Sequence, residues 1–430
     1  MKSGFVERAP RVGAAQDFGP AAAITRRASD RLRAGHLWVY RSDVEELTPA
    51  VGETEMAAGA LVSVMDLRGI PLGTALYSGA SQIALRMVSA STGLTREQYL
   101  AEARVRVGAA LRLRRELAPE AFVTEKAENN ACRLIFSEAD GLPGIVADKY
   151  NDLVVLQLLT QGTAQDDLRV ALTAALVEQL GVEAIVERPD ARVRELEELP
   201  APSAGALFAK NPDAVKLATV FTINGLKFHF DAEAGQKTGA FLDQRLNYAA
   251  AARYAKGRAL DVCTYQGGFA LHMARVCERV TGVDASRTAL EVADRNLQLN
   301  QGLQADVDWI EADAFELLRE FEAAGERFDT LVLDPPAFAK TKRAAEGAMR
   351  GYKELNLRAM KMLKPGGTLV TCSCSHHVGV GEFMEAVTAA ASDAKKRVQV
   401  TETRGAAPDH PWVVTMGETN YLKCVICRVG

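Results

Sequence analysis

The spacing of apolar residues changes several times along the chain. Between Ile24 and Val88, short stretches in which apolar and polar residues alternate, such as LVSVMD and IALRMV, are separated by turns that contain glycine. Alternation with a period of two is typical of strands, and several short strands of this kind favour a small β-barrel. We therefore expect a β-rich domain over residues 23–92. Residues 1–22 mix Gly, Ala, Pro and charges without a period and are expected to form a mobile tail.

The stretch TREQYLAEARVRVGAALRLRREL changes the apolar period from 2 to 3.6 and predicts a long helix. Thr95, followed three residues later by Gln98, forms the pattern of a capping box. The opposite face carries Arg104, Arg112 and Arg115, which are either a solvated helix face or a stripe that faces RNA. The apolar stripe consists of Leu100, Ala103, Val107, Ala110 and Leu111.

The rest of the chain divides into two further regions. Residues 93–215 combine this helix with the apolar run LVVLQLL and a second helical pattern, so we expect a central α+β domain. The stretch APSAGALFAKNPDA at its end is rich in Ala, Gly and Pro and predicts a linker. Over residues 216–430, strand patterns and helical patterns alternate regularly, which predicts a parallel, doubly wound α/β sheet whose ligands lie beyond the carboxyl ends of its strands.

Candidate ligand-binding residues follow the strands of this last region. The stretch ALDVCTYQGGFALHMAR predicts a strand, a tight turn at Gly267 and Gly268, and a helix. Asp284, Asp313 and Asp334 stand at or just beyond the ends of three successive strands. Carboxylates for ribose hydroxyls and an adenine amino group, with a glycine turn under an amino-acid tail, suit S-adenosylmethionine. Singly, each carboxylate would also fit a helix N-cap or a surface turn.

Other nucleotide ligands suit these patterns less well. The glycine turn departs from G-x-G-x-x-G, and the chain contains no G-x-x-x-x-G-K-[ST], which disfavours dinucleotides and nucleoside triphosphates.

The stretch TCSCSHH places two cysteines at alternate positions near a strand end. We expect Cys372, the inner one, to be a core residue, because free cysteine is among the most buried residue types. Cys374, nearer the open end, is the candidate nucleophile, because carbon 5 of a pyrimidine accepts a methyl group only after a thiolate has added at carbon 6. We expect no metal, since Cys424 and Cys427 point to opposite faces of one predicted strand.

Composition and charge narrow the class of protein. The chain has 430 residues, 48% of them hydrophobic and 25% charged, which is enough for two or three domains. An odd count of 7 cysteines disfavours a disulfide framework, and no apolar run approaches the roughly 18 residues of a membrane span, so we expect a cytoplasmic protein. The net charge is −4, yet the first 115 residues hold 16 Lys+Arg against 11 Asp+Glu, which hints at a polyanionic partner at that end.

Together these motifs resemble the class I methyltransferases that make 5-methylcytosine in bacterial large-subunit (23S) ribosomal RNA. The resemblance runs from about residue 24 to the C-terminus. It implies a PUA domain for RNA binding, a central α+β domain, and a Rossmann-like domain with a mostly parallel seven-stranded sheet that uses S-adenosylmethionine. Members of the family are often homodimers. The matching stretches are GHLWVYRSDV, SEADGLPGIVADKY, QKTGAFLDQR, DVCTYQGGFALHMA, GVDASRTALEVADRN, LDPPAFAK and the final SCS.

The resemblance assigns roles to particular residues. Cys374 matches the nucleophile, and Asp284, Asp313 and Asp334 match the acidic cofactor positions. The reaction chemistry by itself suggests that Asp334 could also hold the amino group and ring nitrogen of cytosine. The expected cofactor residues are Thr264, Tyr265, Gly267, Gly268, Asp284, Asp313 and Asp334. The expected RNA-binding residues are Arg26, Arg33, Trp38, Lys237, Arg245 and Phe338.

From the residues alone, several of these RNA contacts have alternatives. Trp38 suits a core position as well as a stacking platform, and Lys237 and Arg245 could be solvated instead of binding phosphate. The turn from Pro335 to Phe338 either offers a wall and an aromatic face for the base or simply ends the strand.

Other functions remain open at this point. The motif DPPAF could serve an amino-group methyltransferase, in which the amine attacks directly and no cysteine is needed. The chain could also be a non-catalytic RNA-binding assembly factor. Related RNA enzymes carry a second cysteine, which aids product release, where this chain has Pro336, so release would rely on another base or water, with Cys372 a weak candidate.

Overall fold

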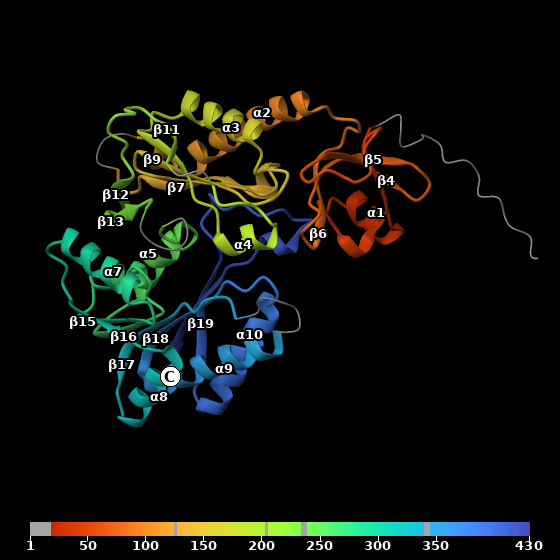
Figure 1. Ribbon diagram of the computed structural model, residues 1–430. Coiled ribbons are helices and arrows are strands. Elements are labelled where there is room, and N and C mark those ends of the chain that lie inside the picture. Colours follow the sequence, from red (N-terminus) through yellow and green to blue (C-terminus); the bar gives the residue numbers. More distant parts are fainter. Residues whose placement is uncertain (1–18, 124–126, 203–204, 234–238, 339–344) are drawn as a thin grey trace, which may run out of the picture.

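The computed structural model describes residues 19–123, 127–202, 205–233, 239–338 and 345–430. Three domains follow one another along the chain (Figure 1). The N-terminal domain, red to orange, lies beside the central domain, which is largely yellow, and the C-terminal domain, green to blue, contains the last sheet. Within the described residues, no helix is long and apolar enough to cross a membrane.

The N-terminal domain contains one six-stranded sheet with the strand order β2-β6-β5-β4-β1-β3. Its first strand begins at Ala21, so the sheet starts two residues before the expected domain boundary, while residues 1–18 of the predicted tail lie outside the described residues. The Thr25 side chain caps helix α1, Arg26–Arg33. The strands are β1 Ala21–Ile24, β2 Trp38–Tyr40, β3 Val44–Thr48, β4 Leu61–Asp66, β5 Pro71–Tyr77 and β6 Ile83–Ser89.

The central domain is a five-stranded sheet covered on one face by two helices. The order is β11-β10-β9-β8-β7, with α2 at Arg96–Leu117 and α3 at Asp166–Gln179. The capping box of Thr95 and Gln98 is confirmed. The predicted linker is wrong in part, because Ala206–Ala209 forms β11 and pairs with β10 at the sheet edge. The other strands are β7 Ala131–Phe136, β8 Ile145–Tyr150, β9 Leu153–Leu158 and β10 Ala184–Glu187.

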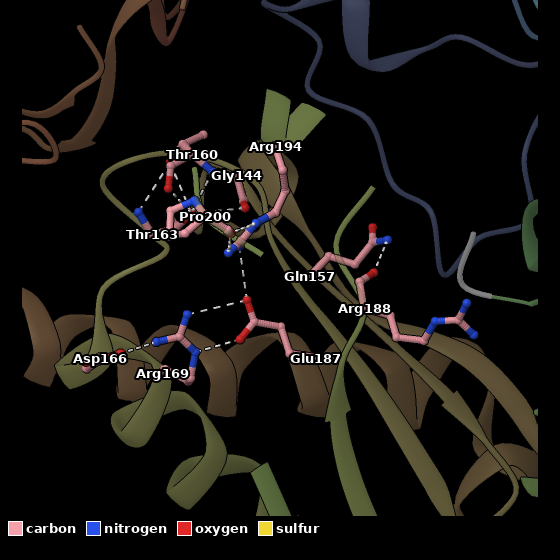
Figure 2. Close-up of polar contacts among 10 residues, drawn as sticks. All are labelled: Gly144, Gln157, Thr160, Thr163, Asp166, Arg169, Glu187, Arg188, Arg194 and Pro200. Atoms are coloured by element: carbon pink, nitrogen blue, oxygen red, sulfur yellow. Dashed lines mark hydrogen bonds and ion pairs between the residues drawn. The ribbon is translucent and has the colours of Figure 1, made fainter. Parts of the chain in front are cut away.

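The end of β10 sends neighbouring side chains in different directions (Figure 2). The buried Glu187 carboxylate accepts hydrogen bonds from Arg169 Nε at 2.6 Å and from Arg194 Nη1 at 3.3 Å, which fixes α4, Ala191–Leu196, against α3. Arg188 points away from this cluster and donates from Nη1 to the Asp231 carbonyl at 3.1 Å. The central domain therefore contacts the chain that enters the C-terminal domain.

A hairpin joins the central and C-terminal domains into one hydrophobic core. Strands β12, Ala218–Ile223, and β13, Leu226–Asp231, are connected by Asn224 and Gly225, both of which have positive φ as a two-residue hairpin turn requires. Tyr150 of β8 stacks on Phe230 at 4.4 Å between ring centroids. Residues of both domains belong to the same buried cluster, so the two domains are packed directly against each other.

The C-terminal domain has the predicted doubly wound architecture. Its seven strands lie in the order β16-β15-β14-β17-β18-β20-β19, and only the pairings of β20 are antiparallel. The strand order reverses between β14 and β17, where a ligand crevice is expected. The strands are β14 Arg258–Val262, β15 Arg279–Asp284, β16 Asp306–Glu311, β17 Phe328–Leu333, β18 Leu363–Ser373, β19 Val398–Arg404 and β20 Lys423–Val429. The helices are α5 Arg245–Tyr254, α6 Gly268–Met273, α7 Arg287–Leu299, α8 Ala314–Ala323, α9 Ala345–Met362 and α10 Val380–Ala394.

Candidate functional site

The turn after β14 is held from below by a buried carboxylate. Asp261 Oδ2 accepts hydrogen bonds from Thr264 Oγ1 at 2.6 Å and from the Ala270 backbone N–H at 2.9 Å, so the strand, the turn and α6 are tied together. Burial raises the pKa of Asp261 to about 7, against the effect of these hydrogen bonds. Asp261 Oδ1 is buried and has no hydrogen-bond partner within the described residues. A buried acceptor without a partner is costly unless a ligand or water completes it.

The glycines of this turn are required by close packing. Gly267 has φ +84°, and a Cβ on Gly268 would lie 2.5 Å from Tyr248 Cζ. Cys263 and Tyr265 also have positive φ, at 63° and 51°, which is uncommon for residues with a side chain. Backbone strain of this kind gathers at ligand sites, because the surrounding structure has to enforce it.

The three strand-end carboxylates expected from the sequence gather around this turn. Asp284 accepts from the Tyr265 N–H at 2.9 Å and from the Ser286 N–H at 2.9 Å, so its position is fixed by the backbone. Burial is the largest cause that raises the pKa of the Cys263 thiol. The next causes are four negative charges, those of Asp284, Asp334, Asp261 and Asp313. The carboxyl ends of β14, β15, β16 and β17 therefore bring four carboxyl groups close to one turn.

Asp313 is also a helix cap. Its Oδ1 accepts from the backbone N–H groups of Phe315 and Glu316, at 2.9 and 3.1 Å, at the start of α8. The helix N-cap, which the sequence offered as the alternative to a ligand contact, is thus present in the fold. The exposed side chain of Asp313 lies beyond β16, so capping and a ligand contact are compatible.

Asp334 directly follows β17 and is held by a residue that the sequence reasoning did not single out. Gln244 Nε2 donates to Asp334 Oδ2 at 3.0 Å, and Asn247 Nδ2 in turn donates to Gln244 Oε1 at 2.7 Å. Burial and the negative charges of Asp243 and Asp261 raise the pKa of Asp334 to about 8, and the Gln244 hydrogen bond opposes this rise. The Asp334 carboxyl group therefore holds its proton to a higher pH than an exposed carboxyl group does.

The two cysteines of TCSCSHH have different environments. Cys372 is fully buried, faces Cys424 across the β18–β20 ladder, and belongs to the hydrophobic core, as expected. β18 ends at Ser373, so the loop rather than strand alternation sets the direction of Cys374. Cys374 is half-buried, and its Sγ lies 3.9 Å from the carbonyl oxygen of Pro335. Because Pro335 follows Asp334, the thiol lies beside the end of β17.

Phe338 packs against two aromatic rings of helices α8 and α9. Its ring lies 4.9 Å from that of Tyr352 and 5.9 Å from that of Phe315, measured between centroids. The ring is partly buried against α9, so its packing accounts for part of its surface and leaves the rest available to a base.

The N-terminal RNA-binding candidates are not equivalent. The Arg26 side chain is 92% exposed and its only ion pair among the described residues is a long one, 3.7 Å to Asp30. Arg33 donates to Asp66 Oδ2 at 2.7 Å. Trp38 donates from Nε1 to Glu138 Oε1 at 2.7 Å, and the Arg86 guanidinium lies 5.5 Å from its ring centroid. Trp38 therefore joins the N-terminal domain to the central domain, which favours a packing role over a stacking platform for RNA bases.

Arg245 differs from the expectation of a cation that is open to phosphate. Only 4% of it is exposed, and its guanidinium forms an ion pair with the buried Asp409. Although burial raises the pKa of Asp409, the charges and hydrogen bonds of His410 and Arg245 lower it below its usual range. Asp409 Oδ2 also accepts from the Arg133 N–H at 2.9 Å, so this pair fixes the β19–β20 loop on the central domain. Lys237 lies outside the described residues.

Three further residues complete the site and were missed. Gln244 stands inside QKTGAFLDQR and Asp261 inside DVCTYQGGF, so both motifs contained the signal. Tyr421, whose hydroxyl donates to Asp243, comes from the β19–β20 loop, and no sequence pattern indicated it. No group of three or more His, Cys, Asp or Glu side chains within the described residues is arranged to hold a metal ion.

Comparison with protein families gives two matches. Residues 153–421 match the family model described as S-adenosylmethionine-dependent methyltransferase, and residues 23–90 match a PUA-like domain. The second match agrees with the expected N-terminal domain. The first begins inside the central domain, at β9, so this family unit includes three of the five strands of the central sheet as well as the doubly wound domain.

Individual proteins agree with these matches. A protein of Pseudoalteromonas translucida named ribosomal RNA large subunit methyltransferase I is 37% identical over 402 residues, which is 93% of this chain and 96% of that protein. A protein of the same name from Shewanella amazonensis is 39% identical over 92% of this chain and 95% of its own length. A crystal structure of a methyltransferase complexed with SAH has a TM-score of 0.77 at 18% identity and covers 94% of this chain and 99% of its own, which shows the shared fold.

Proposed function

The chain belongs to the S-adenosylmethionine-dependent methyltransferase family, and from that premise we propose that it methylates carbon 5 of a cytosine in large-subunit ribosomal RNA. The half-buried Cys374 thiol, which lies 3.9 Å from the carbonyl oxygen of Pro335 at the end of β17, is the observation that carries this proposal. Two relatives whose names specify large-subunit ribosomal RNA, and the PUA-like domain, support the choice of substrate.

The residues of the β14 turn fit the cofactor of this family. Asp284 is fixed by two backbone N–H groups beside the turn, and the buried Asp261 Oδ1 lacks a partner among the residues that the structure describes. Bound S-adenosylmethionine supplies an electrophilic methyl group on its sulfonium. We assign its binding to Thr264, Tyr265, Gly267, Gly268, Asp284, Asp313 and Asp334, with Asp261 as a support from below.

Cys374 makes carbon 5 of the cytosine nucleophilic. Its thiolate adds to carbon 6 and forms a carbon–sulfur bond, and the electrons of the 5,6 double bond move into the ring toward N3. A carboxyl group that is protonated at neutral pH can deliver its proton to N3 as this charge develops. Asp334 therefore acts as the acid, and its other oxygen accepts from the exocyclic amino group, which distinguishes cytosine from uracil.

Product release reverses the addition. Once carbon 5 has taken the methyl group, its proton leaves to a base, the carbon 5–carbon 6 double bond forms again, and the Cys374 thiolate departs with the electrons of the carbon–sulfur bond. N3 returns its proton to the Asp334 carboxylate, which restores the acid. Cys372 does not serve as this base, because it is fully buried in the core against Cys424. The base is then water or another group.

Methyl transfer from labelled S-adenosylmethionine to protein-free large-subunit rRNA tests the proposal. We expect 5-methylcytidine from the wild type and from Cys372→Ala, and none from Cys374→Ala. Methylation by Cys374→Ala with an N-methylated product would favour the amino-group alternative, in which DPPAF binds an amine that attacks directly. An intact protein that binds RNA but not S-adenosylmethionine would favour the non-catalytic assembly factor instead.

Two further expectations depend on this function. An enzyme that modifies bacterial ribosomal RNA works in the cytoplasm, and we propose this location for the chain. We also propose a homodimer, on the basis of the family resemblance. Light scattering of the purified protein, with and without rRNA, would measure the mass of the assembly.

A further inference from the structure

A lysine ammonium group is buried beside the loop that carries Cys374. Lys423, at the start of β20, is 3% exposed. Its Nζ donates to three carbonyl oxygens, those of Ser375 at 2.7 Å, Tyr421 at 2.7 Å and Val378 at 2.8 Å. All three donor positions of the ammonium are thus directed at main-chain acceptors, which fixes Nζ in one place.

The strand register places Lys423 next to the cysteine. Lys423 pairs with Ser373 in the antiparallel β18–β20 ladder, and its side chain reaches forward to the carbonyl of Ser375. The residue between these two contact points is Cys374. Lys423 therefore spans the peptide segment that presents the thiol.

None of these three hydrogen bonds joins the Lys423 ammonium to a carboxylate. Burial lowers the pKa of Lys423 to about 8, and the negative charge that most opposes this shift is that of the Cys374 thiolate, ahead of Glu382. At neutral pH the ammonium is still largely protonated. A buried cation near a thiol stabilises the thiolate, because the attraction is strong where water is excluded.

We propose that Lys423 is a positioning residue that fixes the Cys374 loop through three carbonyl oxygens and stabilises the Cys374 thiolate with its buried ammonium charge. The inference rests on the proposed function, in which the thiolate is the nucleophile. It adds a buried, fixed positive charge that favours ionisation of the Cys374 thiol.

Other titratable groups face the same loop. Tyr352 from α9 forms hydrogen bonds with Ser373 and Ser375, and the Cys374 charge acts on it. Tyr421 precedes β20, and the Cys374 charge acts on it too. Burial lowers the pKa of His376, as do the charges of Lys423 and His377. Of these groups, only Lys423 brings a positive charge that is both buried and fixed at neutral pH.

Site-resolved alkylation of Cys374 tests the inference without requiring methyl transfer. The rate of iodoacetamide modification at Cys374 is followed by mass spectrometry from pH 5 to 10, in full-length wild type, Lys423→Met and Lys423→Arg. We expect Lys423→Met to raise the midpoint of the rate by about one pH unit or more and to slow modification at pH 7 roughly tenfold. Lys423→Arg, which keeps the charge, should restore part of the shift.

Lys364→Met is the matched control, since Lys364 lies on β18 at its far end, where it is exposed and paired with Asp329. It should leave the midpoint unchanged. A midpoint that moves by less than about 0.3 units in a Lys423→Met protein that still binds S-adenosylmethionine would overturn the inference.

A second measurement covers the case in which Lys423→Met does not fold. Coupling between two charges is reciprocal, so loss of the thiol must change the titration of the lysine. In Cys374→Ser, the pKa of Lys423, followed by carbon NMR of labelled lysine, should fall below its wild-type value. An unchanged value would overturn the inference.

The outcomes separate this inference from the proposed function. If Cys374→Ala still methylates rRNA while Lys423→Met shifts the thiol midpoint, the proposed function fails and the lysine–thiolate coupling stands. If Cys374→Ala is inactive and the midpoint does not move, the proposed function stands and the role of Lys423 is overturned.

Discussion

The side chain of Gln244 donates a hydrogen bond to Asp334 Oδ2 at 3.0 Å, and it joins the start of α5 to the end of β17. Gln244 is itself held by Asn247 and is almost fully buried. One oxygen of Asp334 is therefore fixed before any substrate arrives, which orients the other toward the crevice between β14 and β17.

Removal of this hydrogen bond should impair catalysis more than folding. In Gln244→Leu, Asp334 loses a donor, so its pKa rises further and its orientation is no longer fixed. A hydrogen bond between neutral groups contributes about 0.5–1.5 kcal/mol, and we expect kcat/KM for rRNA to fall roughly 2- to 10-fold. Steady-state kinetics measure the loss, while binding of S-adenosylmethionine by calorimetry reports whether the site remains folded. An unchanged kcat/KM would contradict the role given to Gln244.

The raised pKa of Asp334 predicts the direction of a pH effect on stability. Its folded pKa of about 8 lies above the unfolded value of about 4, so its contribution to stability is fully present below about pH 4 and is lost as the pH rises through 8. The free energy of unfolding of the wild type should therefore fall more steeply between pH 5 and 8 than that of Asp334→Asn. Urea titrations at several pH values measure this difference. Parallel curves would show that Asp334 is ionised in the folded protein.

The glycine turn gives a prediction with a matched control. Gly268→Ala places a methyl group 2.5 Å from Tyr248 Cζ, so either the ring or the turn must move. Overpacking of this kind costs about 1–3 kcal/mol. We expect a lower melting temperature and at least tenfold weaker binding of S-adenosylmethionine. Gly181→Ala, where a Cβ would meet no atom within 4 Å, should leave both quantities unchanged. Equal effects of the two substitutions would contradict this reading of the turn.

Arg26 and Arg245 were both expected to bind RNA, but their substitutions should have different effects because only Arg26 is exposed. Arg26→Gln removes an exposed charge, so rRNA binding should weaken and the slope of log K against log salt should fall by about one, with no loss of stability. Arg245→Met removes the guanidinium partner of the buried Asp409, which keeps His410, and should destabilise the protein by about 3 kcal/mol. Filter binding at several salt concentrations and thermal unfolding measure the two effects. A salt-dependent loss of affinity in a stable Arg245→Met protein would restore the original expectation.

Trp38 should act in domain packing. Trp38→Phe keeps the ring but removes the hydrogen bond to Glu138, which retains Arg86 at 3.0 Å. We expect a loss of about 1–2 kcal/mol in stability and rRNA affinity within twofold of wild type. Denaturant unfolding and RNA binding at fixed salt give the two values. A large loss of affinity at unchanged stability would indicate that the indole stacks on a base.

The amino-acid sequence by itself determined the order of the domains, the doubly wound sheet and the positions of the main chemical groups. Period-two and period-3.6 patterns reflect which residues are buried on each element, so the strands that end at Val262, Asp284 and Leu333 could be located from local spacing. The glycine turn and the core position of Cys372 followed for the same reason. The local sequence was sufficient to predict the position of a residue wherever that position depends only on its own strand, helix or turn.

Only the tertiary structure decided which distant side chains meet. Arg245 reads as a free cation in the sequence, but Asp409, 164 residues later, neutralises it in the folded protein. The predicted linker contains β11 because the edge of the β10 strand offered hydrogen bonds that composition does not reveal. Gln244 and Lys423 gained their places beside Asp334 and Cys374 in the same way. Contacts between residues far apart in the chain depend on packing and register, which no local pattern encodes.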